Sequence, residues 1–255
     1  QLAQQRIALR ALGDVNLGIF QGLLPDIRSS GAAEMQADIR GSFSAPPVLG
    51  ALLISNGRLR HFAFPHSFEN VNGRVEFDVS GLNADLTGRL GGGPIRINGR
   101  LGFRGLEPTE YNVVATGQNM RLRYPEGFRS VVAAASALRR DFFSPVLLGT
   151  VTVQNATLEQ TFDTGGAGLF GFAAVGVGAG SAPPTVPSRI PVRFDVRVNA
   201  PSTLRVENRA ARLVSSAELN VRGTYDQPLV FGRVDIASGE VLFEGNRYQL
   251  PRGTV

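Results

Sequence analysis

Apolar and polar residues alternate one by one through most of this chain. In the stretch RVEFDV and just beyond it, Val75, Phe77 and Val79 are separated by Glu76 and Asp78. Successive side chains of a β-strand point to opposite sides, so such a run gives the strand one apolar and one polar face. The runs are short and are bounded by Gly, Asn or Pro, which is typical of antiparallel strands joined by turns. The pattern therefore predicts an all-β protein.

The composition agrees with a folded chain that has many turns. The 255 residues include 31 glycines and 15 prolines, while 43% are apolar and 18% are charged. A chain of this length and apolar content can bury a hydrophobic core. The absence of cysteine excludes disulfides and thiolate sites. No run of about 18 apolar residues occurs, so no transmembrane helix is predicted.

The basic residues are scattered along the chain. All 26 are arginines, and the formal net charge is +5. They mostly alternate with apolar residues, which indicates the solvated faces of strands. Nucleic-acid binding needs basic grooves with stacking aromatics, and the aromatics here are mostly Phe at apolar positions. We therefore expect no nucleic-acid partner.

No catalytic constellation is recognisable. The two histidines, His61 and His66, have no third metal ligand nearby. Without lysine there is no phosphate-binding lysine motif, and GVGAGS at 176–181 neither follows a clear strand nor opens a helix. We expect no enzymatic activity, no metal and no cofactor. An inward-facing pair of carboxylates at one end of the sheet would point to the alternative, a glycosidase-like enzyme.

One sequence unit occurs three times. The copies start at Pro46, Pro145 and Pro228. Each predicts a proline-bearing turn, a strand, and a second turn that closes a hairpin, most clearly at Asn56-Gly57. The shared later positions are a glycine (Gly50, Gly149, Gly232), a branched aliphatic (Ile54, Val153, Ile236) and a small turn residue (Gly57, Ala156, Gly239).

Two segments need separate interpretation. Residues 130–143 are rich in Ala and Leu, which favours a helix, but their alignment with the strand that precedes the third copy predicts a strand.

Residues 163–189 are rich in Gly, Ala and Pro and predict a mobile loop. The alternative is an apolar loop that touches a membrane or a partner.

These features divide the chain into four parts. Residues 1–33 form an amino-terminal edge segment of uncertain structure, and residues 34–162 form the first part of the sheet. The loop occupies 163–189, and residues 190–255 form the last part, which we expect to be truncated.

A long one-sided antiparallel sheet must cover its apolar face. It can curve into an open apolar trough, a half-pipe whose lining is left for a ligand, or it can close as a β-sandwich. We predict the trough, and the closed sandwich is the alternative. The residues expected to line a lipid groove are Val75, Phe77, Val79, Ile95, Ile97, Leu101, Phe103, Phe194, Val196, Val198, Leu219, Val221, Val234, Ile236, Val241 and Phe243.

The carboxy-terminal residues 218–255 resemble the carboxy-terminal domain of the TamB family (translocation and assembly module), within the AsmA-like group of bacterial envelope proteins. The family pattern is aliphatic-x-aliphatic-x-Gly-Thr, then Pro-x-aliphatic-x-Gly, then a strand, a glycine and Tyr-x-Leu. The stretches DIRGSFSAPPVLGALLISNGRLR, SPVLLGTVTVQNATLEQTF and GGGPIRINGRL also resemble the family. The matching positions are Leu219, Val221, Gly223, Thr224, Pro228, Val230, Gly232, Gly239, Gly245, Tyr248 and Leu250.

The resemblance implies a β-taco trough in the periplasm, as part of a longer chain anchored in the inner membrane. It implies phospholipid acyl chains as cargo and an outer-membrane β-barrel protein of the TamA/BamA type as partner. It also implies phospholipid transport between the membranes, assembly of outer-membrane β-barrel proteins, or both. The alternative is a structural or adhesive all-β domain with a closed core and no lipid path. The sequence shows no amino-terminal anchor and ends soon after Tyr248, so neither anchoring nor docking has support from the residues present.

Overall fold

The computed structural model describes most of the chain. The described residues are 6–22, 27–42, 48–62, 64–104, 107–123, 128–140, 144–158, 192–207, 211–224, 228–243, 246–251 and 253–254.

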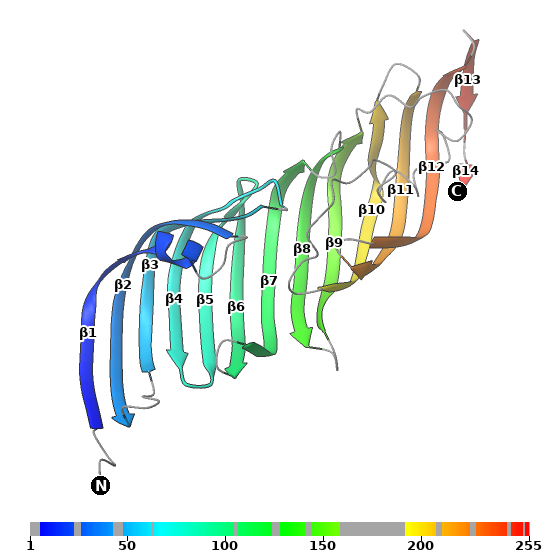
Figure 1. Cartoon of the computed structure of the whole chain (residues 1–255). Coiled ribbons are helices and arrows are strands. Elements are labelled where there is room, and N and C mark those ends of the chain that lie inside the picture. Colours follow the sequence, from blue (N-terminus) through cyan, green and yellow to red (C-terminus); the bar gives the residue numbers. More distant parts are fainter. Residues whose placement is uncertain are drawn as a thin grey trace. The chain divides into compact units, whose positions relative to one another are not determined.

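The described residues are almost entirely β-strand, as the alternation predicted (Figure 1). One short 3-10 helix, η1 (Leu17–Gly22), is the helical element among them. The strands are β1 (Arg6–Asn16), β2 (Ile27–Ser42), β3 (Val48–His61), β4 (Phe68–Asp78), β5 (Gly81–Leu90), β6 (Gly93–Arg104), β7 (Glu107–Arg123), β8 (Phe128–Arg140), β9 (Pro145–Leu158), β10 (Arg193–Glu207), β11 (Ala211–Thr224), β12 (Pro228–Phe243), β13 (Asn246–Leu250) and β14 (Gly253–Thr254).

The strands follow one another in the sheet in chain order. The hydrogen-bonded order runs from β1 to β13 without returning to β1, and β14 pairs with β12. The sheet is therefore open, which confirms the predicted fold class of a long antiparallel sheet that is not closed. One pair differs from the antiparallel expectation, because β9 and β10 run parallel. Parallel neighbours need a long crossover connection, and residues 159–192 separate these two strands.

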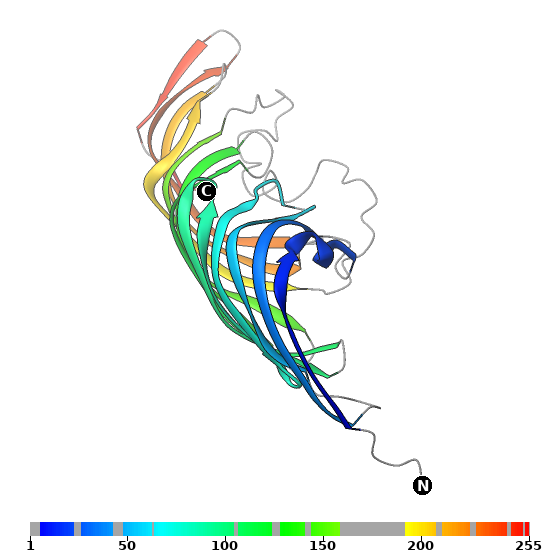
Figure 2. The same cartoon turned by 90° about the vertical axis from the view of Figure 1, so that its left-hand side faces the viewer.

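The chain divides into two compact units, which are described separately. Unit 1 comprises residues 1–117, with β1 to β6, η1 and most of β7. Unit 2 comprises residues 118–255, with β8 to β14. The strands of unit 1 curve along their length, as Figure 2 shows for the blue to cyan part of the chain. No helix among the described residues is long and apolar enough to span a membrane.

The three repeat units each begin a long strand, but the second turn is not a hairpin. Residues 48–61, 145–158 and 228–243 run through the expected turn positions as single strands. The expectation that Asn56-Gly57 closes a hairpin is therefore wrong. Asn56 has a φ of 52°, and the register between β3 and β4 shifts between Ile54 and Gly57. The dipeptide forms a β-bulge, which uses the same left-handed backbone that a hairpin turn requires.

The other two copies carry bulges at matching positions. In β9, Val153 and Asn155 pair with consecutive residues of β8, which leaves Gln154 as the extra residue. In β12, Ile236 and Ser238 pair with consecutive residues of β11, which leaves Ala237 as the extra residue. A bulge bends the strand that carries it. The repeated feature is therefore a long strand with a bend at a fixed distance from its start.

The ambiguous segment at 130–143 is a strand as far as the structure describes it. Strand β8 covers Phe128–Arg140, so the alignment predicted this part correctly and the local helix propensity did not decide the outcome. Residues 141–143 and the Gly/Ala/Pro-rich segment 163–189 lie outside the described residues.

Candidate functional site

One face of unit 1 is apolar over its whole width. In an antiparallel pair, directly opposed residues share a face of the sheet, and the register therefore defines rows of side chains across the strands. One row joins Phe77, Leu82 and Leu101, and the next joins Val75 with Ala84. A third row joins Leu86 with Ile97. These rows form the apolar face of unit 1.

Six of the seven residues expected in this part lie on the strands of that face. Val75 and Phe77 come from β4, whereas Ile95, Ile97, Leu101 and Phe103 come from β6, and all six are half-buried. Val79 does not join them, because it lies in the turn between β4 and β5 and is 67% exposed. The Asp78 carboxylate sets this turn by accepting hydrogen bonds from the Ser80 N–H at 2.7 Å and the Gly81 N–H at 3.0 Å.

The same face contains residues that the sequence reasoning missed. Leu52 lies opposite Val75 and Met35, and Val113 of β7 continues that row beside Gly99. Leu52 was hidden because the run ALLIS places apolar residues on both faces of β3. Leu82 and Leu86 follow the alternation of β5 and could have been found from it.

Unit 2 has an apolar face built in the same way. Val198 lies opposite Leu219 and beside Val151, and the row ends at Gly232. The adjacent row joins Val196, Val221 and Val230. Phe194 and Val234 occupy the rows on either side of these two, since Phe194 pairs with Gly223 and Val234 pairs with Ala217. All six expected residues in these rows are half-buried.

Three of the expected residues have a different setting. Val241 is 7% exposed and belongs to a closed cluster with Val206, Ala211 and Leu213, against which Ile236 also packs. This cluster lies beyond the bulge of β12, where Ala211 pairs with Val241 and Val206 pairs with Leu213. Phe243 lies in β12 opposite Asn246, and its side chain is outside the described part of the structure.

Most rows of the two apolar faces are only half-buried. The expected Val, Leu, Ile and Phe side chains of these rows are half-buried, whereas Val206, Leu213 and Val241 at one end of the unit 2 face are buried. In a closed β-sandwich, the inward side chains of two sheets interdigitate and leave large residues fully buried. The half-buried side chains of these rows are therefore lateral neighbours within one layer. Among the described residues, η1 covers one end of the unit 1 face through Leu17.

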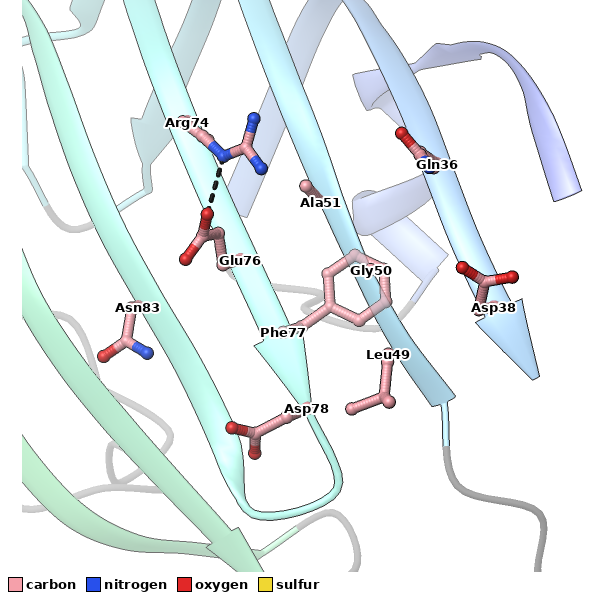
Figure 3. A pocket seen from close by; sticks show the side chains of 10 residues that line it. All are labelled: Gln36, Asp38, Leu49, Gly50, Ala51, Arg74, Glu76, Phe77, Asp78 and Asn83. Carbon is pink, nitrogen blue, oxygen red and sulfur yellow. Dashed lines mark hydrogen bonds and ion pairs between the residues drawn. The ribbon is translucent and has the colours of Figure 1, made fainter. Parts of the chain in front are cut away.

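The polar face of unit 1 contains a shallow depression of about 370 Å³ (Figure 3). It follows a row that joins Gln36, Ala51, Glu76 and Asn83. Figure 3 shows Arg74 beside Glu76, and the Arg74 Nε donates to the Glu76 carboxylate at 2.8 Å. Its remaining lining residues are Asp38, Leu49, Gly50, Phe77 and Asp78.

Two carboxylates of this depression, those of Asp38 and Asp78, have lowered pKa values. A hydrogen bond from Arg10 lowers the pKa of Asp38, and the pKa of Asp78 is lowered chiefly by hydrogen bonds from the Ser80 hydroxyl and N–H. Both carboxylates are therefore ionised at neutral pH, whereas a general acid needs a raised pKa. Within the described residues, no three His, Asp or Glu side chains gather where they could hold a metal ion.

The apolar faces are therefore the candidate binding surfaces of the two units. They present rows of Val, Leu, Ile and Phe that lie side by side and are half-buried. They offer little hydrogen bonding to orient a polar molecule, because their rows are built of apolar side chains and glycine. Such a surface can bind hydrocarbon by burial of apolar area and does not select among chains of similar width.

Comparison with known proteins supports a relationship over the larger part of the chain. The family model described as the TamB C-terminal domain matches residues 82–255. Neither the curated proteins nor the solved structures contain a match. The matched region begins in β5 and includes all of unit 2, so it contains the second and third repeat copies, which form the bulged strands β9 and β12. The chain therefore belongs to the TamB family of bacterial envelope proteins.

Proposed function

We propose that the apolar faces of this protein carry phospholipid acyl chains between the inner and outer membranes of the cell envelope. The observation that supports this proposal is the open state of the apolar rows in both units. A protein that used these rows only as a core would cover them, because uncovered apolar area loses its contribution to stability.

The energetics favour this cargo. A hydrocarbon chain gains about 0.8 kcal/mol for each CH2 group that leaves water. A run of half-buried Val and Leu side chains offers this gain repeatedly along a row. The described residues of these rows include no charged side chain that a moving chain would have to pass. No cofactor or catalytic group is needed for this activity, so we propose a non-enzymatic conduit.

Membership of the TamB family supports the cellular setting of the proposal. The conduit would work in the periplasm as part of an inner-membrane-anchored chain, with an outer-membrane β-barrel protein of the TamA/BamA type as its partner. The same open rows could also shield apolar strands of outer-membrane β-barrel proteins during their assembly. The lipid function is preferred because the described residues of these rows are apolar side chains and glycine, with few hydrogen-bonding groups.

A pair of matched substitutions tests the lipid proposal. Val198→Asp places a carboxylate in the middle of an apolar row, where a passing acyl chain would have to desolvate it. Asn220→Asp adds the same charge to the polar face, beside Arg197. Purified proteins are examined by circular dichroism and by native mass spectrometry for bound phospholipid. We expect a folded Val198→Asp protein with at least tenfold less lipid (about 1.4 kcal/mol), and a normal Asn220→Asp protein.

A folded Val198→Asp protein with wild-type lipid content would contradict the proposal. Val196→Asp, in the adjacent row, repeats the test at a second site. If both variants unfold, the rows are a core and not a conduit.

A further inference from the structure

The helix η1 packs against one end of the apolar face of unit 1. Leu17 is 6% exposed, and a Cβ placed at Gly57 would lie 3.0 Å from a methyl group of Leu17. The Ser29 hydroxyl donates to the Leu17 carbonyl at 2.7 Å, and the Gln21 side chain donates to the Ser29 carbonyl at 2.7 Å. The position of η1 is therefore defined by packing and by hydrogen bonds.

This anchored end exposes several large apolar side chains. Ile19 of η1 is 63% exposed, Phe62 is 54% exposed and Leu59 is 41% exposed. Leu59 lies opposite Ser29, which places it beside η1. Phe62 follows the end of β3, and the Arg28 guanidinium lies 5.1 Å from the centre of its ring. The fold holds these apolar groups in place without covering them.

The same end has an excess of positive charge. Its last register rows contain Arg28, Arg58, Arg60 and Arg89, and Glu69 is the one acidic side chain among the described residues of these rows. Glu69 lies 3.1 Å from Arg58. Arg28 and Arg60 are directly opposite each other on β2 and β3, and neither has an ion pair with a described residue. Like charges in this relationship destabilise a sheet.

The opposite end of unit 1 shows that this excess is local. There Asp38 pairs with Arg10 at 3.1 Å, and Arg100 lies within 4 Å of both Asp78 and Glu110. Exposed apolar residues occur at that end too, for example Val79. The combination of exposed apolar groups with uncompensated arginines is therefore specific to the η1 end.

We propose that the η1 end of unit 1, formed by η1, the end of β3, Phe62 and residues 64–68, docks on the surface of an anionic phospholipid bilayer. Aromatic and aliphatic side chains insert at the headgroup level, while neighbouring arginines bind lipid phosphates. The Arg28–Arg60 opposition, which costs stability in water, becomes favourable when a phosphate lies between the two. This docking does not require that the apolar rows carry lipid.

Vesicle sedimentation tests the docking. The purified chain is mixed with vesicles of phosphatidylcholine alone or with about 30 mol% phosphatidylglycerol. We expect binding to the anionic vesicles, weakened by salt because surface charges are screened. Ile19→Ser and Phe62→Ser should each weaken this binding about tenfold, because each removes one inserted side chain. Arg60→Gln should weaken binding to the anionic vesicles only.

The matched control is Val79→Ser, an equally exposed apolar position at the other end of the unit, which should bind as the wild type does. Val198→Asp should also bind vesicles normally, and this separates docking from lipid carriage on the rows. Since all the substituted side chains at this end are exposed, the melting temperatures of these variants should not fall below the wild-type value. Three results would overturn the proposal: no binding to anionic vesicles, unchanged binding of Ile19→Ser and Phe62→Ser, or a dimer in light scattering that Phe62→Ser dissolves.

Discussion

The ring of Phe77 packs onto Gly50 across the β3–β4 pair. A Cβ at Gly50 would lie 2.5 Å from a ring carbon of Phe77 and would overlap the carbonyl oxygen of Gln36 on the other neighbouring strand. Figure 3 shows the ring beside this position. The glycine is the first shared position after the proline in the repeat unit. An added Cβ at Gly149 or Gly232 would likewise approach a carbonyl oxygen of the preceding strand.

Gly50→Ala should therefore destabilise the protein by about 1–3 kcal/mol, the usual cost of forcing extra volume into a packed contact. The measurement is urea unfolding followed by circular dichroism. Gly13→Ala is the control, because nothing lies within 4 Å of a Cβ added there, and it should change stability by less than about 0.5 kcal/mol. Equal effects of the two substitutions would show that the Phe77–Gly50 contact is not tight.

Asn56 holds the bulge of β3 with a φ of 52°. Its N–H donates to the Asn72 side chain at 2.9 Å. A β-branched residue is strained in this conformation, whereas glycine is not. Asn56→Val should cost about 1–2 kcal/mol, and Asn56→Gly should be close to neutral. Thermal unfolding of both variants checks this, and tolerance of valine would argue against a left-handed residue at the bulge.

Period-2 alternation predicted the strands and the members of each apolar face, because the side-chain direction in a strand depends only on local geometry. The alternation fails where local hydrogen bonds redirect the chain: Val79 continues the pattern of β4, yet Asp78 turns the chain at that point. Asn56-Gly57 was misinterpreted because a hairpin and a bulge place the same demand on the backbone.

Features that depend on contacts between distant residues could not be predicted from sequence patterns. The parallel pairing of β9 with β10 depends on the path of the connection between them. Ile236 and Val241 alternate like Val196 and Val198, yet Val241 belongs to a buried cluster and Ile236 packs against it, which the alternation does not show. The anchoring of η1 through Leu17 and Ser29 depends on side chains that carry no distinctive motif.

The difference between closed cluster and open face can be measured on one strand. Leu213 and Leu219 lie on the same side of β11, but Leu213 is 3% exposed in the cluster, whereas Leu219 is half-buried on the open face. Leu213→Ala should cost about 2–5 kcal/mol, as for other core leucines. Leu219→Ala should cost about 1 kcal/mol, because the surrounding surface is already partly hydrated. Equal losses would mean that the open face is packed like a core.

Asp38 should give a defined acid dependence of stability. The hydrogen bond from Arg10 lowers its pKa in the folded protein, with Arg40 contributing less. The stabilisation is therefore fully present above the unfolded carboxyl pKa of about 4 and is lost as the pH falls through the lower folded pKa. The gap in unfolding midpoint between wild type and Asp38→Asn should be constant near neutral pH and should close in acid. A gap that widens in acid would contradict a lowered pKa of Asp38 in the folded protein.

Photocross-linking tests the lipid conduit most directly. A photoreactive amino acid is placed at Val198 or Val221 on the apolar face of unit 2, or at Arg197 or Asn220 on its polar face, and each protein is irradiated in cells with radiolabelled phospholipid. The four positions are neighbours on β10 and β11 and differ mainly in the face that they occupy. The proposal predicts lipid adducts at Val198 and Val221 and none at Arg197 and Asn220. Absence of adducts at the apolar positions, or equal adducts on both faces, would contradict it.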